Sequence, residues 1–177
     1  KLNIPIMIME PIKGGALASY APEVEEIFKA VRPEKSIASW ALRWVASKPQ
    51  VKVVLSGMST EDQLKDNLET FENFEALSEK ELETVDKVVT EVRSRIKNGC
   101  TGCRYCMPCP FGVDIPKNFR FWNDESMYQD GNGKRRYNNL KEAKATFCKE
   151  CGKCAEDCPY NAIAHLKRPC KFARPVD

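Results

Sequence analysis

Two short apolar runs near the start of the chain have the pattern of buried β-strands. The run IPIMIM covers residues 4–9 and ends at Glu10-Pro11, and the run VKVVLSG covers residues 51–57. Continuous apolar and β-branched residues over four to eight positions indicate a strand that is covered on both faces. We therefore predict buried strands at residues 4–9 and 51–56.

Between and after these runs, apolar residues recur at intervals of three and four, which predicts amphipathic helices. Pro22 suits the first position of one helix, and a second helix follows Pro33. Ser78 and Glu81 have the spacing of a capping box, in which each residue bonds the backbone of the other. We expect the long helix that they begin to end at Asn98-Gly99.

The alternation of strands and helices is typical of a βαβ unit, whose strands are parallel and covered by helices. Two parallel strands are too few to form a sheet that is buried on both faces. We therefore expect residues 1–98 to be part of a larger sheet, which either upstream strands or another chain would complete.

The composition of the chain changes sharply at residue 99, because all nine cysteines come after it. This change predicts a domain boundary between residues 1–98 and 99–177. No apolar run approaches the roughly 20 residues that cross a bilayer, and the opening does not resemble a signal peptide. We therefore expect a cytoplasmic protein, and in that reducing compartment clustered cysteines usually bind metal.

Eight of the cysteines form two runs, each closed by Cys-Pro. The first has the spacing C-x2-C-x2-C-x2-C-P and begins at Cys100, and the second has the spacing C-x2-C-x2-C-x3-C-P and begins at Cys148. In ferredoxins with two clusters, three closely spaced cysteines bind one [4Fe–4S] cluster and the fourth binds the other. The predicted ligands are Cys100, Cys103, Cys106 and Cys158 for one cluster, and Cys148, Cys151, Cys154 and Cys109 for the other.

Two other interpretations of the cysteines remain. Structural zinc would use four cysteines per ion, but it leaves the triple x2 spacing and both Cys-Pro endings unexplained. Disulfides are the least expected. Cys170 has no partner in this scheme and is interpreted as a plain thiol, and His165 as a packing residue that is also close enough to Cys158 to tune a cluster.

The apolar residues around the ligands have two interpretations, which the sequence leaves open. They either keep water away from the clusters and so influence the reduction potential, or they simply pack. These residues are Tyr105, Met107, Phe111, Val113, Tyr160, Ala162 and Ile163.

Charge divides the chain unevenly. Residues 1–96 carry 13 Lys and Arg against 16 Asp and Glu, which gives −3, and residues 97–177 carry 15 against 9, which gives +6. The basic part is interpreted as a solvated surface or a docking face for an acidic redox partner. A nucleic-acid partner is not expected.

The connection between the cysteine runs shows helical spacing at residues 115–131 and 134–147. This part resembles the α-helical ferredoxin domains that are appended to respiratory and nucleotide-reducing enzymes.

Three stretches together resemble a bacterial branch of the aldo/keto reductase family: IMIMEPIKGGALA, SIASWALRWVASKPQVKVVLSGMSTEDQLKDNLETF and CTGCRYCMPCPFGVDIP. The resemblance implies that residues 1–98 are the last two β/α units of a (β/α)8 (TIM) barrel, followed by a mainly α-helical ferredoxin-like domain with two clusters. Strands one to six of that barrel carry the family's catalytic aspartate, tyrosine, lysine and histidine, so none of the four can be placed in this chain.

The same resemblance implies a site for NADP or NAD. Met9, Glu10, Pro11 and Ile12 match positions near the nicotinamide and diphosphate, where Glu10 replaces a serine of the family. The residues that match the adenosine end are Ser56, Gly57, Met58, Gln63 and Asn67. Many relatives bind the 2′-phosphate with a lysine and an arginine, which correspond here to Gly57 and Gln63. The alternative for this segment is a turn and a helix cap without a nucleotide.

Taken together, the sequence predicts electron transfer through two [4Fe–4S] clusters in an aldo/keto reductase-family oxidoreductase. The intact protein would perform nicotinamide-dependent carbonyl and alcohol chemistry, with a redox protein or a small carbonyl compound as partner. Self-association through the incomplete barrel is a further expectation. The alternatives are a stand-alone electron carrier or docking module and a zinc-stabilised interaction domain.

Overall fold

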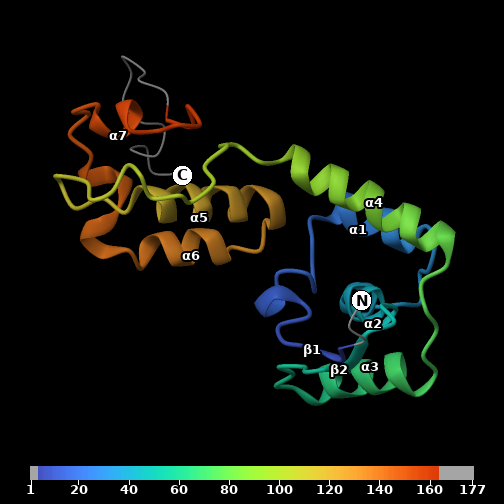
Figure 1. Ribbon diagram of the computed structural model, residues 1–177. Coiled ribbons are helices and arrows are strands. Elements are labelled where there is room, and N and C mark those ends of the chain that lie inside the picture. Colours follow the sequence, from blue (N-terminus) through green and yellow to red (C-terminus); the bar gives the residue numbers. More distant parts are fainter. Residues whose placement is uncertain (1–3, 164–177) are drawn as a thin grey trace. The chain divides into compact units, whose positions relative to one another are not determined.

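The computed structural model describes residues 4–163, which form two compact units, one ending at Arg93 and the other beginning at Ser94. The first contains β1 (Ile6–Ile8), η1 (Lys13–Gly15), α1 (Pro22–Lys29), α2 (Ile37–Ala46), β2 (Val51–Val54), α3 (Glu61–Glu72) and nearly all of α4 (Glu79–Ser94) (Figure 1). The second contains α5 (Ile115–Tyr128), α6 (Asn132–Asn138), η2 (Lys141–Ala143), η3 (Ala145–Phe147) and α7 (Lys153–Glu156). Across residues 4–163, none of the helices has the length and apolar character that crossing a membrane would require.

The two predicted strands form a parallel pair, which confirms the expected βαβ order. Ile6 pairs with Val51 and Ile8 with Val54, and a register shift follows Ile6. The N–H of Leu55 donates to the carbonyl of Ile8 at 2.9 Å. Both strands are shorter than the apolar runs that predicted them, and their carboxyl ends meet at one edge of the sheet.

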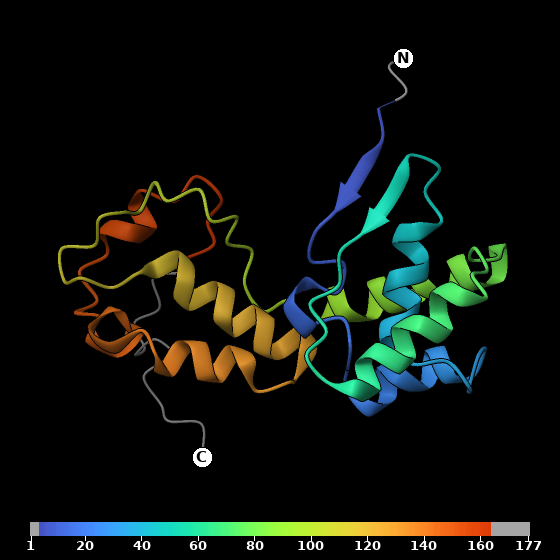
Figure 2. The same ribbon diagram turned by 90° about the horizontal axis from the view of Figure 1, so that it is seen from below.

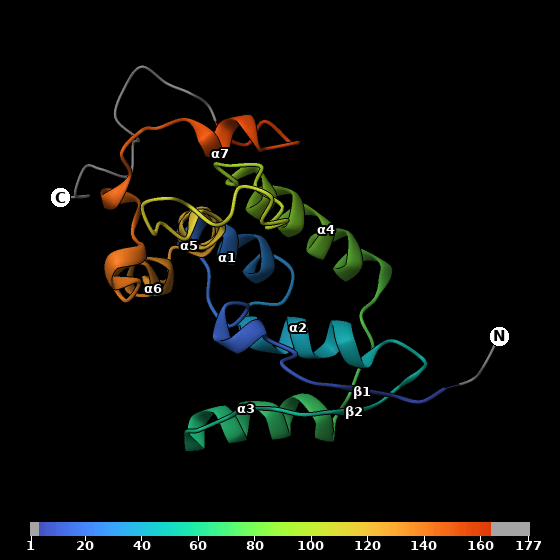
Figure 3. The ribbon, with the colours of Figure 1, turned by 60° about the vertical axis from the view of Figure 1, so that its left-hand side comes forward.

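The prediction that these strands are buried is wrong. On β1 and beside it, the exposed fraction is 45% for Ile6, 60% for Met7 and 75% for Met9, and Val53 on β2 is 40% exposed. The physical reason is the width of the sheet, because a parallel pair needs neighbours at both edges and layers on both faces to be covered. Helix α2 packs against β2, as Figure 3 shows, and this contact covers only part of the pair.

The apolar core of the first unit lies among the helices and not on the sheet. Phe28 of α1 and Trp40 of α2 are buried with their ring centroids 4.8 Å apart, and Val88 and Val92 of α4 are buried too. Trp44, which shares the apolar spacing of Trp40, is 42% exposed, and the ammonium group of the nearby Lys48 lies over its ring.

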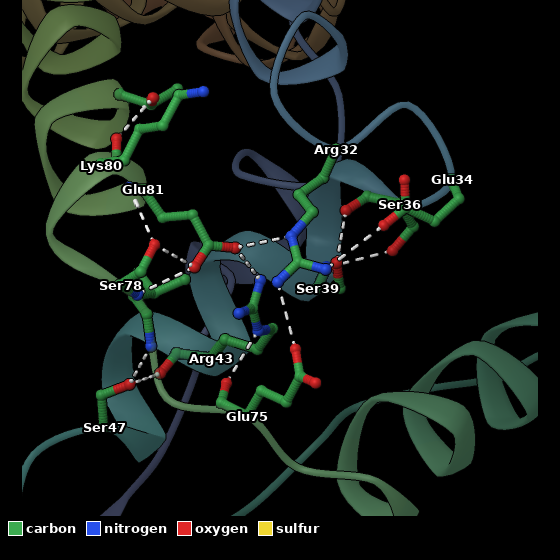
Figure 4. A network of polar contacts seen from close by, with 12 residues as sticks. Arg32, Glu34, Ser36, Ser39, Arg43, Ser47, Glu75, Ser78, Lys80 and Glu81 are labelled. Atoms are coloured by element: carbon green, nitrogen blue, oxygen red, sulfur yellow. Dashed lines mark hydrogen bonds and ion pairs between the residues drawn. The ribbon is translucent and has the colours of Figure 1, made fainter.

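A buried carboxylate of α4 joins this helix to α2 and to the loop that follows α1 (Figure 4). Oε1 of Glu81 accepts hydrogen bonds from Arg43 at 2.7 Å and from Arg32 at 3.2 Å, and Oε2 accepts from the Ser78 backbone N–H at 2.8 Å. Burial raises the pKa of Glu81, but the hydrogen bonds from Arg43 and Ser78 outweigh it and lower the pKa to about 2. The Ser78–Glu81 capping box is confirmed, because Ser78 Oγ also accepts from the Glu81 N–H.

In the second unit, α5 and α6 pack side by side (Figure 2). Gly133 lies where the helices are closest, and a Cβ atom there would stand 2.5 Å from the Phe121 carbonyl oxygen. Two helical predictions are wrong in their extent. The long helix ends at Ser94 and not at residue 98, and the stretch predicted at 134–147 is helical only to Asn138, after which two 3-10 turns follow.

Candidate metal centres and nucleotide-binding segment

Apart from Cys154, which lies in α7, the cysteines of both runs lie on irregular backbone that turns through left-handed residues. Gly102 has φ 75° and Gly152 has φ 89°, a left-handed conformation that glycine adopts without strain. Glu150 also has a positive φ, and its N–H donates to Cys148 Sγ at 3.3 Å. Loops that hold iron–sulfur clusters direct N–H groups toward sulfur in this way, and such bonds tune the cluster.

Four of the predicted ligands surround a single hollow. Cys100, Cys103 and Cys106 of the first run and Cys158 of the second line a shallow hollow that is open to solvent. Apolar residues complete the wall, among them Pro116, Ala162 and Ile163. In Figure 2 the loop of the first run (yellow-green) and the segment after α7 (red) lie side by side. Four soft thiolates around one apolar hollow fit the ligand set of a [4Fe–4S] cluster.

Three of the other four cysteines, those of the second run, are also close to one another. Cys154 lies close enough to Cys148 and Cys151 for their charges to affect its pKa. Cys154 and Cys109 both pack against the small apolar core formed by Cys106, Val113 and Ile115. Cys158 is therefore near the first three cysteines of the other run, and Cys109 shares its apolar core with Cys154 of the other run. Among residues 4–163, no three His, Cys, Asp or Glu side chains are arranged to hold a single metal ion.

The two innermost thiols hold their protons strongly. Burial raises the pKa of Cys106, and the charges of Cys100, Cys103 and Cys158 raise it further. Burial together with the other thiolates raises the pKa of Cys154 to about 11. Crowded thiolates repel one another, so metal binding would have to displace these protons.

Asn98 joins the start of the first run to the end of the second. Its side-chain Oδ1 accepts from the Cys100 N–H at 2.9 Å, and its Nδ2 donates to the Ala162 carbonyl at 2.6 Å. Asn123 of α5 fixes the same segment, because its Oδ1 accepts from the N–H groups of Lys97 and Asn98, both at 3.0 Å. The backbone on either side of the hollow is thus held in place by amide side chains.

A second asparagine of α5 positions the start of the second run. Asn118 is buried, donates to the Ala143 carbonyl at 2.9 Å and accepts from the Ala145 N–H at 2.8 Å. These bonds fix the turns that lead into Cys148. The sequence patterns did not predict the roles of Asn98, Asn118 and Asn123. One signal was available, since asparagine inside an otherwise amphipathic helix is disfavoured unless its amide has a partner.

The apolar residues near the ligands divide into two groups. Val113 is buried, and Met107 and Ile163 pack against its core, whereas Tyr105 is 70% exposed and Phe111 is also exposed. Tyr160 and Ala162 line the hollow. Two further residues considered from the sequence, His165 and Cys170, lie outside the described residues.

Part of the expected nucleotide-binding segment is gathered around the start of α3. Asn67 Nδ2 donates to Ser56 Oγ at 2.9 Å and contacts Met58 Sδ at 3.3 Å, and Gln63 Oε1 accepts from the Ser59 N–H at 2.8 Å. Gly57 is exposed and lies in the loop after β2, three residues beyond Val54. The helix N-terminus is already capped, because Thr60 Oγ1 accepts from the Gln63 N–H.

The residues expected near the nicotinamide follow β1 at the same edge of the sheet. Met9 and Glu10 are exposed, Pro11 is buried and Ile12 is half-buried. Glu10 has a φ of 52° and its carbonyl accepts from the Lys13 N–H at 2.9 Å, so the strand ends in a tight turn.

Comparison with protein families gives two matches. The aldo/keto reductase family model matches residues 1–90, and the 4Fe-4S dicluster domain model matches residues 99–163. Comparison with curated proteins and with solved structures gave no match. The first model covers just over half of the 177 residues, and the second covers all eight cysteines of the two runs. The chain therefore belongs to the aldo/keto reductase family and carries a 4Fe-4S dicluster domain.

Proposed function

We propose that this chain transfers single electrons through two [4Fe–4S] clusters, within an oxidoreductase that performs nicotinamide-dependent carbonyl and alcohol chemistry. When bound, such clusters supply reversible one-electron transfer at potentials that the surrounding protein sets. The observation that supports the proposal most directly is the hollow lined by Cys100, Cys103, Cys106 and Cys158, because it unites thiols from both runs around an apolar space.

The ligand assignment belongs to the same proposal. One cluster is held by the thiolates of Cys100, Cys103, Cys106 and Cys158, and the other by those of Cys148, Cys151, Cys154 and Cys109. The buried neighbours exclude water, and N–H groups such as that of Glu150 stabilise thiolate charge.

The first part of the chain, residues 1–98, is proposed to be the last two β/α units of a (β/α)8 barrel, with the domain boundary at 98/99. Parallel β1 and β2 with apolar side chains left exposed support a sheet that continues beyond this pair. Pro11, Ile12, Ser56, Gly57, Met58, Gln63 and Asn67 are proposed to contact NADP or NAD.

A second candidate function is a stand-alone electron carrier in which residues 1–98 are only a scaffold. It is favoured by the bonds between Asn67 and Ser56 and between Gln63 and Ser59, because these polar groups already satisfy one another. Titration of the chain with NADPH and NADH, followed by the nicotinamide fluorescence, separates the two candidates. Saturable binding that is lost in Asn67→Ala supports the nicotinamide-dependent function, and its absence supports the carrier.

The electron-transfer function itself is tested by analysis of the anaerobically prepared protein. About eight iron atoms and eight sulfides per chain, with electron paramagnetic resonance signals of reduced clusters, are expected. Colourless protein that contains zinc and no sulfide would overturn the proposal in favour of a zinc-stabilised domain.

A further inference from the structure

The second cysteine run is the more exposed of the two. Cys148 and Cys151 are both exposed, whereas in the first run only Cys103 is exposed and Cys106 is buried. Phe147, which immediately precedes Cys148, is 46% exposed and offers an aromatic contact next to the ligands. Because electron transfer slows steeply with distance, a protein partner would approach the redox centre that lies nearest the surface.

The chain around this run is strongly basic. Residues 134–153 contain seven Lys or Arg and two Glu, which gives a charge of +5. Lys141 and Lys149 are exposed, and Lys149 lies between two of the ligands. Bound thiolate clusters add negative charge beneath this surface, but they leave the exposed ammonium groups in place.

Several cations near the first run form ion pairs with aspartates. Arg104 and Lys117 both contact Asp114, at 3.7 and 3.0 Å, and Arg120 contacts Asp124 at 3.8 Å. In the basic segment, Arg136 and Lys153 also have acidic partners, Asp124 and Asp157. By contrast, within residues 4–163 neither Lys141 nor Lys149 forms an ion pair. Lys149, which adjoins the exposed Cys148 in the sequence, therefore carries a charge without an ion-pair partner next to that thiol.

We infer that the surface formed by residues 134–153, called here the basic face, docks an acidic electron-carrier protein and passes its electron to the cluster of the second run. The inference rests on the proposed function and adds the site and the kind of partner. One electron leaves the reduced carrier and one arrives at the cluster, without a bond made or broken. Complementary charge would steer the encounter, and Phe147 would supply an apolar contact at its centre.

The competing explanation is that these lysines only offset the negative charge of the cluster. In that case they would influence the reduction potential but not the rate of encounter with a charged carrier. Steered association falls steeply with ionic strength, so salt dependence separates the two explanations.

The test uses the full chain with both clusters and a reduced acidic [2Fe–2S] ferredoxin of low potential as the probe. Stopped-flow absorbance gives the second-order rate of electron transfer. We expect that rate to fall about tenfold or more between roughly 20 and 300 mM salt. The double variant Lys141→Glu with Lys149→Glu should lower the low-salt rate about tenfold and remove most of the salt dependence, with an intermediate rate for the matching Gln variant.

The control is Lys87→Glu, which makes one such charge change at an exposed lysine of α4. Its rate should stay within about twofold of the unaltered protein. The proposed role of the basic face would be overturned by a second-order rate that does not change with salt concentration. It would also be overturned by a double variant that reacts as fast as the unaltered protein, or by a control variant that reacts as slowly as the double variant. Iron and sulfide content and reduction by dithionite are measured on every variant. An unaltered chain that contains no iron and sulfide, or that dithionite does not reduce, would instead overturn the proposed function.

Discussion

The Asn98 side chain donates a hydrogen bond to the Ala162 carbonyl at 2.6 Å, across 64 positions of sequence. The same amide accepts from the N–H of Cys100 at 2.9 Å. One side chain therefore ties the first predicted ligand of one run to the segment that follows the last ligand of the other. A cluster that takes thiolates from both runs requires these two segments to stay together.

Replacement of Asn98 should loosen this junction. Asn98→Ala removes two hydrogen bonds and leaves a backbone N–H and a carbonyl without these partners, at a cost of about 1–3 kcal/mol. We expect faster loss of iron to a chelator, measured by the decay of the brown absorbance. Asn139→Ala, at an exposed amide after α6, is the control and should behave like the unaltered protein. Equal rates of iron loss for all three proteins would contradict the role of Asn98.

Gly133 should tolerate no side chain. A Cβ atom there would lie 2.5 Å from the Phe121 carbonyl oxygen and 2.7 Å from Glu125 Cβ, so α5 and α6 would have to separate. Gly133→Ala should destabilise the second unit by about 1–3 kcal/mol, measured by thermal unfolding of the cluster-bound protein. At Gly99 a Cβ would meet nothing within 4 Å, and Gly99→Ala should unfold at nearly the original temperature. If both variants unfolded at the same temperature, the close approach of the helices would be wrong.

The first unit should lose stability in acid through Glu81. Its pKa is lowered from 4.5 to about 2, so the carboxylate is favoured in the folded state. The stability that it contributes is fully present above pH 4.5 and disappears as the pH falls toward 2. The loss is on the order of 3 kcal/mol, and hydrogen exchange of the α2 and α4 amides reports it without relying on the clusters.

Glu81→Gln serves as the comparison for this acid effect. At pH 7 the variant should be less stable by about 3–5 kcal/mol, because it leaves the buried Arg43 without its charged partner. Its stability should change little between pH 4.5 and pH 3. An unaltered protein whose α2 and α4 amides have the same protection factors at both pH values, after correction for the intrinsic exchange rate, would contradict the depressed pKa.

The sequence predicted those elements whose signals are local. The parallel strands and the capping box at Ser78 both follow from neighbouring residues. Burial of the strands was mispredicted because it depends on partners beyond this pair. The bonds of Asn98 and Asn118 to distant carbonyls were not foreseen, because a polar side chain in a sequence does not show which backbone group it will meet.

The exposed sheet should promote self-association. Met7 and Val53 are 60% and 40% exposed on strands whose outer edges have unpaired backbone groups. We expect light scattering to show dimers or larger species whose mass falls toward the monomer in the double variant Met7→Lys with Val53→Lys. Leu82→Lys, at an exposed apolar position of α4, should leave association unchanged. A concentration-independent monomer for the unaltered chain would contradict this prediction.

The central claim is that each cluster takes ligands from both cysteine runs. It is tested most directly by finding which of the two clusters is lost in Cys158→Ser. The spectra of Cys103→Ser and Cys151→Ser define the loss of the first-run and second-run clusters. Cys158 lies in the second run but lines the hollow of the first, so Cys158→Ser should give the electron paramagnetic resonance spectrum of Cys103→Ser, with about four iron atoms retained. A spectrum that matches Cys151→Ser instead would show that each run holds its own cluster, and would contradict the account.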